Sequence, residues 1–67
     1  MELNIGENIK KVRELKNITR EQLADDLKMS LSNYSKIERS EIDLTVARLY
    51  EIANVLGVDV SQISKFK

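Results

Sequence analysis

The stretch from Thr19 to Arg39, TREQLADDLKMSLSNYSKIER, has the pattern of two short helices joined by a tight turn. Thr19 and Gln22 match the S/T-x-x-E/Q capping box that begins a helix. Ser30 is a good N-cap for a second helix, and only a sharp turn fits between the two. The rest of the chain must then supply the packing that fixes their angle. The predicted helices are 20–27 and 31–38.

The flanking segments predict three further helices and no strand. Asn4 and Thr45 are suitable N-caps, and Gly57 is suited to a left-handed C-cap. Apolar residues recur at i, i+3, i+4 and i+7 from Leu49 to Leu56, which is the strongest helical signal in the chain. The last helix begins at Asp59 or Val60. The predicted spans are 4–16, 46–56 and a short helix that ends near Ser64.

Several apolar residues indicate which helix faces form the core. In the first helix the stripe runs from Ile5 through Ile9 and Val12 to either Leu15 or Lys16. Tyr34 and Ile37, three residues apart, point inward together. The C-terminal apolar residues either complete the core or contact a second copy of the chain. They are Val58, Val60, Ile63 and Phe66.

Length and composition predict one small globular domain that covers residues 1–67. The chain has no Cys and no His, which removes disulfides, thiolate metal sites and the commonest general acid–base residue. No apolar run approaches the roughly 20 residues of a membrane span, and the N-terminus lacks a signal-peptide core. We therefore expect a cytoplasmic protein that is not an enzyme, with no cofactor, no metal, no membrane partner and no evident small-molecule ligand.

The charge balance argues against nucleic-acid binding, because nucleic-acid binders usually carry a basic surplus. Eleven basic and eleven acidic side chains give a formal net charge of zero. The charges are unevenly distributed, however. Residues 1–20 hold five basic and three acidic side chains, and residues 21–43 hold three basic and six acidic ones. Binding would require the acidic groups Asp25, Asp26, Glu41 and Asp43 to face away from the ligand.

Taken together, these motifs resemble the Cro/repressor-type helix-turn-helix proteins, also called the xenobiotic-response-element family. The resemblance covers roughly Ile5 to Ile63, with the helix-turn-helix at about 20–39. It implies an all-α, compact five-helix lambda-repressor-like domain that binds double-stranded DNA, with the second helix of the motif in the major groove. The matching residues are Ile18-Thr19, Glu21-Gln22-Leu23-Ala24, Leu27, Met29-Ser30, Tyr34-Ser35-Lys36-Ile37-Glu38, Leu49, Ile52-Ala53 and Leu56-Gly57-Val58.

The resemblance also implies roles for individual residues. Arg20 falls at a phosphate-holding position, and Arg39 falls near the next phosphates. Asn33 is close enough to a phosphate or a base. Arg13 and Glu38 fall at the positions of a partly buried ion pair. The base-reading positions are occupied by Leu31, Ser32 and Lys36.

Each candidate contact also has a plain structural interpretation. Leu31 can contact a thymine methyl group or be a half-buried core residue. Lys36 can bind guanine O6 and N7 or be a solvated lysine. Ser32 and Asn33 can bind bases or cap the helix. Arg20 opposes the helix dipole at the start of its helix, which favours the phosphate role.

The chain departs from the family pattern at several positions. Lys28 stands where the turn usually has Gly, and a left-handed Lys28 would cost about 1–2 kcal/mol. Arg39-Ser40 replaces the usual Asn-Gly, Leu44 replaces a common Pro, and Leu31 replaces the usual Gln. The last change affects the target sequence and not the fold.

Two functions therefore fit the sequence. One is a small transcriptional regulator that binds double-stranded DNA sequence-specifically, as a homodimer on a palindromic operator. The other is a protein-interaction module or antitoxin-like partner that has the same fold and weak or no DNA binding. An enzyme fits poorly, because no nucleophile–base constellation is recognisable.

Overall fold

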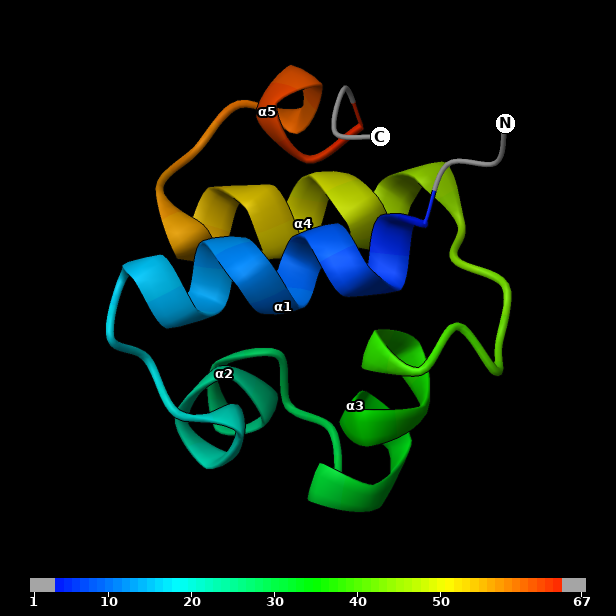
Figure 1. Ribbon diagram of the computed structural model, residues 1–67. Helices are drawn as coiled ribbons and strands as arrows, with labels where there is room; N and C mark the ends of the chain where they lie inside the picture. The colour runs from blue at the N-terminus through cyan, green and yellow to red at the C-terminus, as the bar shows by residue number, and fades with distance from the viewer. Residues whose placement is uncertain (1–3, 65–67) are drawn as a thin grey trace.

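The computed structural model describes residues 4–64 of the chain, and this part is entirely helical between its loops (Figure 1). The predicted all-α five-helix fold is confirmed, with α2 and α3 forming the helix-turn-helix. The helices are α1 (Ile5–Leu15), α2 (Arg20–Asp26), α3 (Leu31–Glu38), α4 (Val46–Leu56) and α5 (Val60–Ser64). None of the described helices is long and apolar enough to cross a membrane.

Each of the first four helices begins at the cap that the sequence predicts. The side chains of Asn4, Thr19, Ser30 and Thr45 each accept a hydrogen bond from the backbone N–H three residues later. At Thr19 the capping box is complete, since the backbone N–H of Thr19 also donates to Gln22 Oε1 at 2.9 Å. Local sequence therefore fixes where these helices start.

The same four helices also end alike, with one residue in the left-handed conformation. These residues are Asn17, Lys28 and Ser40, each with φ of 59°, and Gly57 with φ of 73°. In each case the next residue donates its backbone N–H to the carbonyl five residues back, as in a Schellman motif. Lys28 therefore adopts the left-handed conformation at a cost of about 1–2 kcal/mol.

The residue that follows the left-handed position is apolar at three of these four helix ends and charged at the fourth. Ile18, Met29 and Val58 are partly buried apolar residues that pack against the core. An apolar contact at this position often accompanies the motif. After Ser40, the same position is held by Glu41, which is charged and exposed.

The core lies around α1, which has α5 on one side and the α2–α3 pair on the other (Figure 1). Tyr34 and Ile37 are buried, as predicted, and Asp25 and Asp26 face solvent. Ile63 is fully buried, and Val58 and Val60 are half-buried, while Phe66 is outside the described residues. The buried apolar residues are Ile9, Val12, Leu23, Ala24, Leu27, Tyr34, Ile37, Ile52, Ala53, Leu56 and Ile63.

The prediction that Leu15 or Lys16 continues the apolar stripe of α1 is wrong. Leu15 is 79% exposed, and Lys16 is also exposed. Instead, Arg13 is buried at the inner face. Residues two apart on a helix point about 200° apart, so Arg13 and Leu15 cannot both face the core. Ile18, beyond the end of α1, supplies the apolar contact in place of Leu15.

Gly6 allows α1 to pass very close to the end of α3. A Cβ atom at Gly6 would lie 2.3 Å from the Ile37 carbonyl oxygen and 2.8 Å from the Glu38 carbonyl oxygen. Any side chain here would push the last turn of α3 away from α1. Nearby, Ser40 Oγ donates to Asn4 Oδ1 at 2.9 Å and joins the same two segments.

Candidate nucleic-acid interface

Helix α3 has one buried face and one exposed polar face. Tyr34, Ile37 and Glu38 are buried and hold the helix against the rest of the domain. Ser32 and Asn33 are exposed, and Lys36 is half-exposed. Leu31 is 40% exposed, so part of its side chain can contact a ligand. The exposed face is thus presented on a rigid element, which is what groove recognition requires.

The buried face of α3 carries an ion pair to α1. Arg13 Nε donates to Glu38 Oε2 at 2.6 Å, and Arg13 Nη2 lies 3.4 Å from Glu38 Oε1. Arg13 Nη1 also donates to the Ile18 carbonyl at 2.8 Å. The Tyr34 hydroxyl donates to the same Glu38 carboxylate. The Arg13–Glu38 pair therefore joins α1, the α1–α2 connection and α3 through one buried, well-satisfied network.

This network perturbs the ionisation of its members. Burial, together with the hydrogen bond to the Glu38 carboxylate, raises the pKa of the Tyr34 hydroxyl well above its usual value. Burial alone would lower the pKa of Arg13, but its hydrogen bond to Glu38 and the charge of Glu38 outweigh this and raise it. The two pKa shifts keep the Tyr34 hydroxyl protonated and the Arg13 guanidinium charged across the ordinary pH range.

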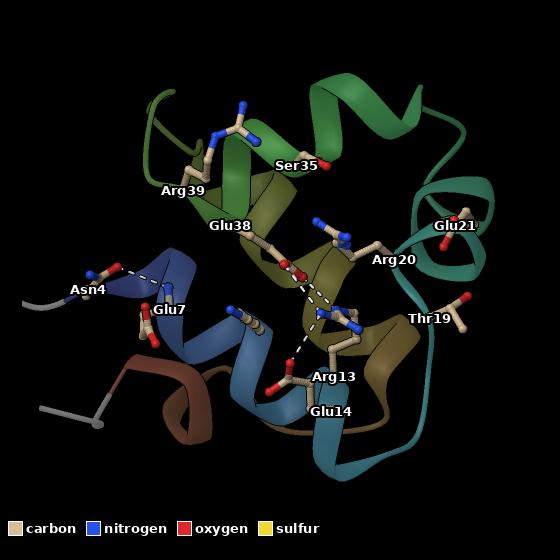
Figure 2. A pocket seen from close by; sticks show the side chains of 11 residues that line it. Asn4, Glu7, Arg13, Glu14, Thr19, Arg20, Glu21, Ser35, Glu38 and Arg39 are labelled. Atoms are coloured by element: carbon tan, nitrogen blue, oxygen red, sulfur yellow. Dashed lines mark hydrogen bonds and ion pairs between the residues drawn. The ribbon is translucent and has the colours of Figure 1, made fainter.

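A polar depression of about 820 Å³ lies over this network, between α1, the start of α2 and the second half of α3 (Figure 2). Its charged lining is balanced and includes four basic and four acidic side chains. Its polar neutral lining includes Ser35 and Thr19. The charged residues are Lys10, Arg13, Arg20 and Arg39 with Glu7, Glu14, Glu21 and Glu38.

The basic residues of the depression differ in whether they are already paired. Arg13 is bound to Glu38, and Arg39 is bound to Glu41. Within residues 4–64 no ion pair is found for Arg20 or Lys10. Figure 2 shows Arg20 reaching from the start of α2 toward Glu38 and Arg13. Arg20 therefore has its guanidinium donors available for an anionic group beside the N-terminus of α2.

Arg39 is held by a two-point contact outside the core. Its Nε donates to Glu41 Oε2 at 2.8 Å, and its Nη2 donates to Glu41 Oε1 at 3.3 Å. Both side chains are about half exposed, at 54% and 50%. The hydrogen bond from Arg39, supported by the charges of Arg39 and Lys36, holds the pKa of Glu41 below its usual range. Glu41 thus lies within the electrostatic reach of two candidate DNA contacts.

The structure distributes the predicted contact residues over two neighbouring surfaces. Arg20 and Arg39 line the depression, together with Lys10 and Ser35, which the sequence did not single out. Ser35 follows Leu31 by four residues, so helical spacing alone indicated that they share a side of α3. The start of α3 lies outside the lining and carries Leu31, Ser32 and Asn33.

Comparisons with known proteins agree with this arrangement. A helix-turn-helix family model matches residues 9–63. The immunity repressor protein of Bacillus phage phi105 is 33% identical over 61 residues, which are 91% of this chain and 42% of that protein. The plasmid copy control protein CopR of Streptococcus agalactiae is 40% identical over 55 residues, which are 82% of this chain and 58% of that protein.

One solved structure extends the comparison to a DNA complex. The master regulator for biofilm formation SinR, solved in complex with DNA, has a TM-score of 0.78 and is 30% identical, over 88% of this chain and 95% of that chain. The chain spans about half the length of the two curated relatives, 42% of one and 58% of the other. Since the family model covers most of the described residues, the predicted membership is confirmed: the chain belongs to the helix-turn-helix family.

Proposed function

We propose that the protein is a transcriptional regulator that binds double-stranded DNA through α3. The observation that carries this proposal is the exposed polar face of α3, fixed on a rigid base by Tyr34, Ile37 and the buried Arg13–Glu38 pair. Two relatives whose names describe a repressor and a copy-control protein, and a neighbour solved with DNA, support it. A regulator acts where the DNA is, so the expected cytoplasmic location belongs to the same proposal.

In this proposal α3 occupies the major groove and α2 lies across the backbone. Lys36 reads guanine through O6 and N7, and Leu31 contacts a thymine methyl group. Ser32 and Asn33 add hydrogen bonds to bases or to a nearby phosphate. Arg20 binds a phosphate at the N-terminus of α2, where the backbone N–H groups also favour an anion.

The protein acts as a homodimer on a palindromic site in this proposal. Two α3 helices would then read half-sites about one helical turn apart. The exposed apolar residues Val46 and Tyr50 are consistent with a second copy, because they lie one turn apart on one face of α4 and are 70% and 60% exposed. Sedimentation of the DNA complex should then show two chains per duplex.

Selection from a pool of random duplexes tests the central claim. We expect enrichment of a palindromic sequence, with a Kd below micromolar and a clearly negative slope of log affinity against log salt. Failure to enrich any sequence would overturn the proposal. It would favour the protein-interaction module, which the balanced charge of the lining residues also suits.

Two substitutions separate the proposed roles within the interface. Arg20→Ala should weaken binding to all duplexes alike and flatten the salt slope by about one unit. Lys36→Ala should relax preference at one base pair, by about 1–3 kcal/mol of discrimination. Lys11→Ala is a suitable control, because Lys11 is an exposed lysine of α1 outside the depression. If both test variants bind every duplex as well as Lys11→Ala does, the assigned contacts are wrong.

A further inference from the structure

Glu41 has a charge and position that the fold does not explain. At the three other helix ends of the same type, the corresponding residue is apolar and packs on the core. At Glu41 the side chain is half exposed and pairs with Arg39, while its backbone makes the same hydrogen bond to the Lys36 carbonyl at 2.9 Å. The turn therefore depends on the backbone N–H of residue 41 and not on its carboxylate, which is free to serve another role.

Glu41 makes a contact with Arg39 that a DNA phosphate would make in the proposed complex. A guanidinium presents its Nε–H and one Nη–H as a fork that matches the two oxygens of a carboxylate or a phosphate. In Arg39 this fork is occupied by Glu41 at 2.8 and 3.3 Å. In Figure 2 the guanidinium of Arg39 extends away from Arg13 and Glu38 at the floor of the depression. A phosphate and the Glu41 carboxylate cannot both occupy this edge of Arg39.

We propose that Glu41 competes with the DNA backbone for Arg39 and thereby sets the affinity of the protein for DNA. This inference rests on the proposed function. In the free protein Glu41 occupies the Nε–Nη2 edge of Arg39, and this edge must exchange the Glu41 carboxylate for a phosphate when DNA binds. Non-specific duplexes, which are bound mainly through phosphates, are weakened most by this arrangement.

The chain contains a closely matched control for this idea. Glu51 also forms an ion pair with an arginine, Arg48, at 2.9 Å, and its side chain is 49% exposed against 50% for Glu41. Glu51 is on α4, and neither member of that pair lines the depression. Glu41→Gln and Glu51→Gln therefore remove the same charge from equally exposed carboxylates, and only the first lies beside the interface.

The test measures binding of both variants to two duplexes over a range of salt concentrations. One duplex is the sequence recovered by the selection, and the other is a mixed-sequence duplex of equal length. Glu41→Gln should tighten binding to the mixed-sequence duplex roughly tenfold at low salt and steepen its salt slope by about 0.9 per freed phosphate contact. Glu51→Gln should change either affinity by less than about twofold, because its pair does not line the depression and its exposed charge is screened by salt.

A double variant identifies the partner through which Glu41 acts. Adding Arg39→Ala to Glu41→Gln should abolish the gain, leaving affinity near that of Arg39→Ala alone. Equal effects of Glu41→Gln and Glu51→Gln, or a gain that survives Arg39→Ala, would overturn the inference and leave the DNA-binding function standing. Absence of binding to either duplex by every variant would overturn both.

Discussion

Two arginine–glutamate pairs lie at the end of α3, and their surroundings give them opposite properties. Glu38 binds Arg13 with side chains only 6% and 8% exposed, whereas Arg39 binds Glu41 with side chains about half exposed. The buried pair lacks water as an alternative partner, so breaking it leaves an uncompensated charge. The exposed pair can exchange its partner for water or phosphate at a much lower cost than the buried pair. Glu38, the last residue of α3, thus anchors the helix, while Arg39, the cap residue that follows it, can exchange its partner.

The largest effect should come from breaking the buried pair. Glu38→Gln leaves Arg13 without its counter-charge, and we expect a loss of about 3–5 kcal/mol in the free energy of unfolding. Urea unfolding measures this loss, with Glu41→Gln as the control at the exposed pair. Equal midpoints for the two variants would show that burial does not distinguish the pairs.

The next largest effect should come from disturbing the close approach between α1 and the end of α3. Gly6→Ala places a Cβ atom against the Ile37 and Glu38 carbonyl oxygens, which belong to backbone that cannot move without shifting α3. We expect a loss of about 1–3 kcal/mol, as for other overpacked sites, measured by urea unfolding. A control elsewhere is Gly57→Ala, where nothing lies within 4 Å and only the φ of 73° opposes the change. Wild-type stability for Gly6→Ala would contradict the close approach.

Alkaline pH should weaken the buried network through Tyr34. Its pKa is higher in the folded protein than the usual value of about 10, so above that pH the unfolded chain binds fewer protons. Stability should therefore fall as pH rises past 10, by about 1.4 kcal/mol per pH unit for this group. Comparison of Tyr34→Phe with Tyr50→Phe isolates the effect, because Tyr50 is 60% exposed. An unchanged pH slope in Tyr34→Phe would assign the loss to other groups.

The smallest effects should come from the left-handed helix ends. Lys28→Gly should raise stability by up to about 1 kcal/mol, since relief of strain exceeds the added entropy of the unfolded chain. Ser40→Gly should raise it less, because it also removes the hydrogen bond to Asn4 beside the exposed pair. Differential scanning calorimetry measures the change in stability of each variant relative to the wild-type protein. A larger gain at Ser40 than at Lys28 would mean that the bond to Asn4 contributes nothing.

The sequence predicted most of the fold because the relevant signals are local. The N-caps Asn4, Thr19, Ser30 and Thr45 act within three residues, and the capping box at Thr19 needs no distant partner. The burial of Tyr34 and Ile37 followed from helical spacing in the same way. The resemblance to a family added the Arg13–Glu38 pair, whose members are 25 residues apart and which no local pattern predicts.

Predictions from the sequence were wrong, or could not be made, where contact with another part of the chain determines the burial or pairing of a side chain. Leu15 lies outside the core because Arg13 takes the inner face to reach Glu38. Asn8, buried on α1, donates to the Ile63 carbonyl at 2.7 Å and joins α1 to α5, which composition and periodicity did not indicate. The pairing of Arg39 with Glu41 depends on the left-handed turn at Ser40, since that turn brings their side chains together.

The sequence by itself therefore determined where the helices begin and end, and which residues of α3 are polar. Caps, turns and helical periodicity act over three to five residues, so they can be recognised in the sequence. The tertiary structure alone decided which charges are free. Arg13, Arg20 and Arg39 are chemically identical, yet one is buried in a pair, one is free of ion pairs among the described residues and one is held by an exposed carboxylate. Electrostatic environment depends on burial and on partners brought together by folding, so only the assembled domain assigns each arginine its role.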